Sequence, residues 1–254
     1  MAARNGIFGL ASLILVAAGL LFMFFIVLAG AIDKSPISKF YFLEANTGRI
    51  PGAPPVSRWT YWNICNGAGG SNRCPSVHPA FPLDPSSHRN FGTRQGVPRN
   101  FVEHHGYYFL MTRFMFAFML MALFFGVMAL FTGLLALCTR LGSYLSSLMT
   151  MLAAFFQAIN AGLMTAAYVK GRDNFRGNGQ PAHIGKYAFG FEWAAFACFV
   201  LSTVLFCLGG GKRKESKASG GKKGFGFGRG RFGGKRSRST RSRGSFVQDK
   251  EYGA

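Results

Sequence analysis

Four long apolar runs most constrain what this chain of 254 residues can fold into. Uncharged runs cover residues 5–32, 114–139 and 141–169, and a fourth run, 187–208, contains the single charge of Glu192. A membrane-spanning helix needs about 20 mostly apolar residues, whereas a helix on a soluble core keeps a polar face. The runs therefore predict four membrane-spanning helices.

The first run has an alternative interpretation as a secretory signal peptide. The apolar core of a signal peptide is about 7–15 residues long, which is shorter than this run. The small residues in its final stretch, LAGAI, would nevertheless suit a cleavage site. Its length favours a membrane span, and a cleaved signal is the alternative.

The polar stretches between the runs divide the chain into eight parts. In chain order we expect an N-terminal segment 1–6, a first span 7–32, a large loop 33–106, a second span with an outer extension 107–139, a third span 140–169, a short loop 170–186, a fourth span 187–208 and a tail 209–254. Only the short sequence CTRLGS joins the second and third spans, so these two helices should form an antiparallel hairpin.

The basic residues predict which side of the membrane each part occupies. The tail contains 14 Lys and Arg against three acidic residues, and basic residues close to a span stay in the cytoplasm. The short loop, with four Lys and Arg, argues for the opposite orientation, but the dense tail outweighs it. We therefore expect a multi-pass protein with both termini in the cytoplasm and both larger loops outside.

This orientation bears on two cysteines of the large loop. Cys65 and Cys74 would face an oxidising compartment, in which disulfides persist, so a disulfide between them is predicted. The alternative is half of a zinc site, to which His78 and His88 could add ligands. Eight residues between the cysteines and the lack of a second cysteine pair disfavour zinc.

The large loop also carries signals for a small β-sheet. Aromatic and β-branched residues favour strands at 39–45 and 58–65, and the sequence NGAGGSN after the second strand supplies a turn. Residues 75–100, rich in Pro, Ser, His and Gly, should be irregular. Such a sheet has little core of its own, and a bridge that closes about ten residues would stabilise it by roughly 2.5–3 kcal/mol.

Trp62, Cys65 and Cys74 form a W-x-x-C-x8-C pattern that resembles the claudin signature, although Thr60 and Tyr61 stand where claudins have Gly-Leu. The four spans, this pattern and the stretch FYFLEANT resemble more closely the fungal SUR-seven/PalI family, over roughly residues 5 to 210. The resemblance implies an all-α membrane protein: a claudin-like bundle of four transmembrane helices with a small disulfide-bridged β-sheet in the first extracellular loop.

The same resemblance implies a function. It suggests a plasma-membrane protein of eisosome-type cortical patches that organises lipids and cortical membrane-domain proteins, with effects on endocytosis, the cell wall and stress responses. Some relatives act instead as accessory sensors in ambient-pH signalling, and this is the alternative function.

Few polar residues lie within the spans. Gln157 and Asn160 share one face of the third span, and Glu192 lies near the outer end of the fourth, where it should reach the membrane interface or an outer lysine. These are too few for an ion pathway, so a channel or transporter is the least favoured function. Small residues such as Ala158 and Gly162 suit helix packing within one bundle, and a homo-oligomer is the alternative.

The sequence predicts no enzyme and no cofactor. It contains no phosphate-binding loop, no HExxH and no GxSxG, which are the motifs that would indicate phosphoryl transfer, zinc-dependent hydrolysis or a serine nucleophile. No metal site is expected.

The tail is of low complexity, with interleaved Gly, Arg and Phe, and should be disordered. Beneath a membrane its expected partners are anionic lipids or acidic proteins; RNA, which similar segments bind, is disfavoured, and a merely solvated tail is a further alternative. The candidate lipid-binding residues are Lys212, Arg213, Lys214, Lys222, Lys223, Arg229, Arg231, Lys235 and Arg236. The candidate phosphorylation sites are Ser237, Ser239, Thr240, Ser242 and Ser245, and the candidate palmitoylation sites are Cys138 and Cys207.

Overall fold

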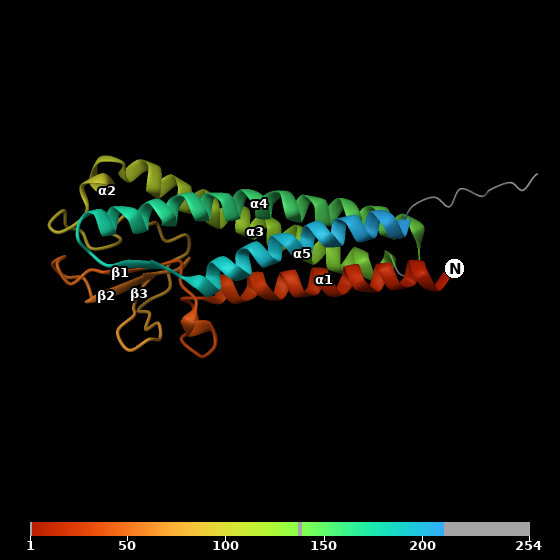
Figure 1. The fold of residues 1–254 in the computed structure, drawn as a ribbon, viewed down its shortest axis with the longest axis horizontal. Helices are drawn as coiled ribbons and strands as arrows, with labels where there is room; N and C mark the ends of the chain where they lie inside the picture. The colour runs from red at the N-terminus through yellow and green to blue at the C-terminus, as the bar shows by residue number, and fades with distance from the viewer. Residues whose placement is uncertain (1, 137–138, 211–254) are drawn as a thin grey trace, which may run out of the picture. The chain divides into compact units, whose positions relative to one another are not determined.

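The computed structural model describes residues 2–136 and 139–210 (Figure 1). Its elements are α1 (Ala2–Leu28), the 3-10 helix η1 (Ile37–Lys39), β1 (Leu43–Asn46), β2 (Val56–Trp59), β3 (Ile64–Asn66), α2 (Arg99–Glu103), α3 (His105–Ala136), α4 (Arg140–Gly177), β4 (Ala182–Ile184) and α5 (Lys186–Gly210). The four long helices form a bundle, and the strands lie at one end of it.

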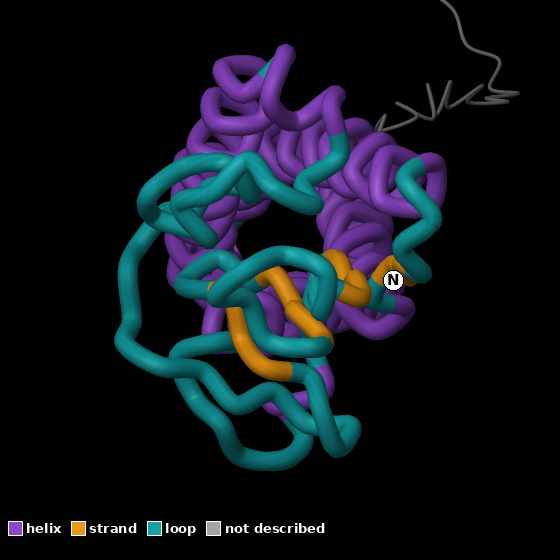
Figure 2. The backbone as a smooth tube through the Cα atoms, turned by 90° about the vertical axis from the view of Figure 1, so that its left-hand side faces the viewer, coloured by secondary structure: helices purple, strands orange, loops and turns teal. Residues whose placement is uncertain are grey.

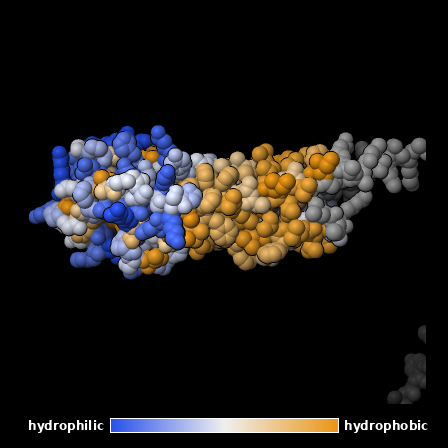
Figure 3. Space-filling view, turned by 90° about the horizontal axis from the view of Figure 1, so that it is seen from below, coloured by the Kyte–Doolittle hydropathy of each residue, from blue (hydrophilic) through white to orange (hydrophobic). Residues whose placement is uncertain are grey.

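The bundle confirms the prediction of four spans. Helices α1, α3, α4 and α5 are each long and apolar enough to cross a membrane. Helix α1 packs against α3 and α5, and α4 packs against the same two helices, so the four surround a common core (Figure 2). Large apolar side chains such as Phe124, Phe131 and Phe155 remain exposed on the outside and contribute to an apolar belt suited to lipid (Figure 3).

Helix α4 is longer than the third span that the sequence predicted. It continues from residue 169 to Gly177, so half of the expected second loop, 170–186, is helical. The added turns bury Phe175, whose ring packs against Trp59 of β2 and Phe101 of α2. The charged side chains of these turns ended the apolar run in the sequence. The helix nevertheless continues, because its apolar face packs against residues 33–104 and 178–185, which we call the sheet layer.

The sheet has four antiparallel strands in the order β3-β2-β1-β4. The expectation of two strands was incomplete, because the segment 58–65 divides into the end of β2 and the start of β3. Thr60 causes the division, since its hydroxyl oxygen accepts hydrogen bonds from the amides of Trp62 and Asn63, at 3.3 and 3.2 Å, and closes a tight turn. The first expected strand begins later, at Leu43, after η1.

The fourth strand was not predicted at all. Strand β4, in the short second loop, pairs with β1 so that Ala182 lies opposite Ala45 and Ile184 opposite Leu43. It has only three residues, which is too short for an alternating pattern to identify. The sheet is thus completed by a segment far away in the sequence.

Candidate functional site

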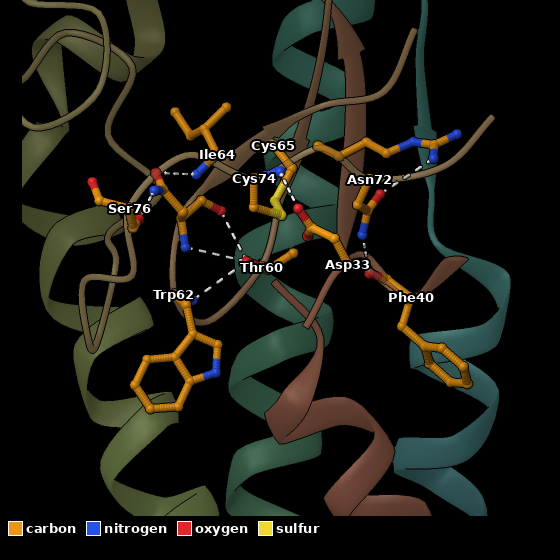
Figure 4. The surroundings of a disulfide bond; sticks show 11 residues. Asp33, Phe40, Thr60, Trp62, Ile64, Cys65, Asn72, Cys74 and Ser76 are labelled. Carbon is orange, nitrogen blue, oxygen red and sulfur yellow. Dashed lines mark hydrogen bonds between the residues drawn. A yellow bond between two sulfur atoms is a disulfide. The ribbon is translucent and has the colours of Figure 1, made fainter. Parts of the chain in front are cut away.

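Within the sheet layer, a disulfide joins Cys65 of β3 to Cys74 (Figure 4). We call residues 65–74 the disulfide hairpin. This confirms the predicted pairing and removes the thiols that the zinc alternative needed. Next to the bridge, the backbones of Asn66 and Arg73 exchange two hydrogen bonds, at 2.8 and 3.0 Å. The amide of Cys74 also donates to a carboxylate oxygen of Asp33, at 3.2 Å. The hairpin is therefore held to the start of the loop as well as to itself.

A buried ion pair between β1 and β2 contacts the disulfide hairpin. Arg58 of β2, only 7% exposed, lies with its Nε 2.6 Å from a carboxylate oxygen of Glu44 on β1. Its guanidinium also donates to the carbonyl oxygen of Gly70 and to the side chain of Asn72, at 3.0 and 3.2 Å. A buried charge is stable only when it is paired and hydrogen-bonded in this way. Sequence reasoning missed Arg58, although Glu44 and Arg58 on two expected strands could have indicated a cross-strand pair.

The turn Thr60–Asn63, which we call the docking turn, attaches the sheet layer to the bundle. The indole N–H of Trp62 donates to the carbonyl oxygen of Val27, in the last turn of α1. Carbonyl groups there have no partner within their own helix, so the tryptophan satisfies one of them. The rings of Tyr61 and Trp62 both pack against Phe116 of α3, with centroids 5.5 Å apart in each case. The motif tryptophan therefore fastens the sheet to two spans.

The docking turn also reaches the other two spans, through a buried polar cluster. The Tyr61 hydroxyl donates to the Asn160 side-chain oxygen at 3.3 Å. The Asn160 side-chain N–H in turn donates to Glu192 Oε1, to which Gln157 Nε2 also donates at 2.7 Å. Burial raises the pKa of the Tyr61 phenol well above its ordinary value, so the hydroxyl remains a donor. The cluster connects the sheet layer to α4 and α5.

The cluster corrects the expectation for Glu192. This side chain of α5 is fully buried, accepts hydrogen bonds from Gln157 and Asn160 of α4, and forms no ion pair with a lysine among the described residues. Gln157 and Asn160 are three residues apart, so both side-chain amides lie on the face of α4 that packs against α5. There they donate hydrogen bonds to Glu192 Oε1. Within the described residues, Glu192 Oε2 and Gln157 Oε1 have no hydrogen-bond partner.

The structure describes few of the other predicted site residues. Cys207, near the end of α5, is exposed, and its sulfur lies 2.9 Å from the hydroxyl of Ser147 on α4. Cys138, the nine candidate lipid-binding residues and the five candidate phosphorylation sites lie outside the described residues. The proposals for them rest on sequence alone.

Loss of the disulfide should destabilise the sheet layer. For the Cys65→Ser variant we expect the free energy of unfolding to fall by about 2–3 kcal/mol, because the unbridged unfolded chain has more conformations to lose on folding. The measurement is thermal unfolding of the detergent-solubilised full chain, together with the amount of protein that reaches the cell surface. Cys207→Ser, which removes an exposed thiol, is the control, and equal stability of both variants would contradict the prediction.

Comparison with known proteins agrees with this architecture. The sequence profile of the SUR7/PalI family matches residues 8–205. Protein SUR7 of Candida albicans is 36% identical over 204 residues, covering 80% of this chain and 74% of the relative. Protein SUR7 of Saccharomyces cerevisiae is 30% identical over 199 residues, covering 77% of this chain and 65% of the relative. An uncharacterized plasma membrane protein of the same yeast is 27% identical over 188 residues, with 72% and 62% covered.

The match thus includes all four spans, the docking turn and the disulfide hairpin, and it spans just under two thirds of the length of these S. cerevisiae relatives. With four membrane-spanning helices and a disulfide-bridged sheet at one end of the bundle in the matched region, the chain is a multi-pass membrane protein that belongs to the SUR7/PalI family.

Proposed function

We propose that this protein is a structural organiser of a plasma-membrane domain of the eisosome type, and that it affects membrane organisation, endocytosis, the cell wall and stress responses. The observation that supports this most is the docking turn. It ties the sheet layer to α1 and α3 directly and to α4 and α5 through the polar cluster. A sheet fixed to every span forms one body with its helices, and such a body can offer a defined surface to neighbouring proteins.

Two further features fit this function. One relative carries the name of a plasma membrane protein, which supports the same location here. In the proposed orientation both termini lie in the cytoplasm and the sheet layer outside, because basic residues next to a span stay in the cytoplasm. The tail, with 14 basic and three acidic residues, would then bind anionic lipids of the inner leaflet, each basic residue near the surface contributing about 1 kcal/mol.

Imaging of a full chain with a fluorescent tag at its C-terminus tests the proposal. We expect stable cortical patches and a signal that a membrane-impermeant quencher does not reach. An even or endosomal signal would favour the pH-signalling role instead, and a signal confined to internal membranes would contradict both functions. Quenching in intact cells would overturn the orientation.

The same experiment tests the proposed role of the tail. Replacing Ser237, Ser239 and Ser242 with aspartate should weaken the patches, because the added negative charge opposes the attraction between the tail and anionic lipids. The protein should stay in the membrane, because its four spans still anchor it. Replacing the same three residues with alanine is the control. Patches unchanged by aspartate would show that the charge of the tail does not control them.

A further inference from the structure

A surface groove of about 560 Å³ runs beside the disulfide hairpin. One wall includes Ile64, Cys74 and Ser76, which are labelled in Figure 4. The segment that carries Arg89 and Phe91 also lines it. The size lies within the range of about 300–1,000 Å³ that is usual for small-molecule sites. The groove is distinct from the docking turn's contacts with the spans, and the proposed organiser function does not use it.

The ionisable side chains that line the groove all belong to basic residue types. Arg73, Arg89 and His78 contribute to its lining, which contains no aspartate or glutamate. Both arginines are exposed, and the guanidinium group of neither forms a hydrogen bond or ion pair with any residue in the described part of the chain. By contrast, Arg58 in the same layer is fully engaged with Glu44 and its neighbours. The two groove arginines thus retain their full hydrogen-bonding capacity.

The backbones that carry these arginines are nevertheless fixed. Arg73 is held by its two backbone hydrogen bonds to Asn66, next to the disulfide. Arg89 precedes Asn90, whose side chain accepts a hydrogen bond from the Trp59 indole at 3.2 Å and donates to the Pro82 carbonyl at 3.1 Å. Because the backbones are fixed, ligand binding has to order only the arginine side chains and not the segments that carry them, which lowers the entropy lost.

The surroundings do not neutralise this charge. Residues 33–106 and 170–186 together contain twelve Lys and Arg and five Asp and Glu. Three of the acids already pair with arginines outside the groove, in the ion pairs Arg58–Glu44, Arg99–Glu103 and Arg172–Asp173. The groove therefore lies in a positive field that attracts anions.

We propose that this groove binds an anionic saccharide, with phosphate or carboxylate groups on Arg73 and Arg89. The planar guanidinium fork matches the oxygens of both groups. Between the charges the lining offers the rings of Phe81 and Phe91 and the polar side chains of Asn66 and Ser76, a mixture suited to a hydroxylated ring. An acidic peptide that adds as a strand fits less well, because the backbone of Asn66 on the edge strand β3 is already hydrogen-bonded to Arg73.

The test uses the full chain in detergent and four polymers as probes: phosphorylated dextran, polygalacturonate, neutral dextran and polyglutamate. Phenylglyoxal modifies accessible arginines, and peptide mass spectrometry reads each site separately, so binding to the basic tail does not obscure the result. We expect phosphorylated dextran, polygalacturonate or both to protect Arg73 and Arg89 while Arg94 stays reactive. Whichever of the two protects more strongly identifies the acid group.

Two double variants with the same change in charge complete the test. Arg73→Gln with Arg89→Gln should weaken binding of the protecting polymer about tenfold or more, since charge-assisted hydrogen bonds are lost. The control, Arg94→Gln with Arg99→Gln, alters exposed arginines that do not line the groove and should weaken it less than about twofold. Equal losses of binding in the two double variants would overturn the proposal. So would protection of Arg73 and Arg89 by neutral dextran equal to that by the acidic saccharides, or stronger protection by polyglutamate.

Discussion

Replacing Glu192 with leucine should lower the free energy of unfolding by about 2–4 kcal/mol, because two buried amide donors would each lose the carboxylate oxygen that accepts their shorter hydrogen bond. Gln157 would keep only the backbone oxygen of residue 192 as an acceptor, and Asn160 only the Met119 sulfur. The donors are the side-chain amides of Gln157 and Asn160, both fully buried and both directed at the Glu192 carboxylate. Leucine fills the space but accepts no hydrogen bond. The loss should also loosen Tyr61, since the Asn160 amide that accepts its hydrogen bond would be held only by the Met119 sulfur.

Glutamine at the same position should behave differently. The Glu192→Gln variant keeps a carbonyl oxygen for both donors and replaces only Oε2, which has no hydrogen-bond partner among the described residues. We therefore expect stability equal to or above that of the natural chain. Thermal unfolding in detergent, followed by tryptophan fluorescence, distinguishes the cases, and a leucine variant as stable as the glutamine variant would contradict the role assigned to the cluster.

The Gly185→Ala substitution should damage the sheet by about 3 kcal/mol or more, because it forces backbone apart. Gly185 follows β4, and its amide donates to the carbonyl oxygen of Phe42 at 3.0 Å. A Cβ atom added there would lie 1.6 Å from the backbone oxygen of Tyr41. A side chain could rotate away from such a contact, but a carbonyl within the sheet layer cannot, so β4 should separate from β1.

Gly190→Ala provides the matched control for this prediction. Gly190 lies five residues further along, on α5, and an added Cβ would meet no described atom within 4 Å. Alanine favours a helix over glycine by up to about 1 kcal/mol, so the control should be neutral or stabilising. Amide hydrogen exchange over residues 41–46 reports directly on the β1–β4 pairing. Unchanged protection in the Gly185→Ala variant would show that β4 stays paired with β1 and would contradict the prediction.

The sequence alone determined the features that depend on local composition. Apolar runs of more than 20 residues, three of them uncharged and the fourth with one acid, require helices in lipid, where every backbone group must be satisfied within its own segment. The four spans were therefore predictable from the length of the runs. The Cys65–Cys74 bridge was predictable for a similar reason, since the partners are close along the chain and joined by turn-forming residues. The family resemblance rested on the same short pattern around Trp62.

Only the tertiary structure decided the features whose partners are distant in the sequence. Strand β4 forms because its backbone pairs with β1, with Ala182 opposite Ala45, and a strand of three residues has no sequence pattern that predicts this pairing. Glu192, expected at the interface, is buried because α4 presents two amides to it from more than thirty residues away. Helix α4 continues beyond its apolar run because the ring of Phe175 packs against Trp59. Periodicity reports which face of a segment is apolar, but the energy of a buried polar group depends on the atoms packed against it, and those are set by the fold.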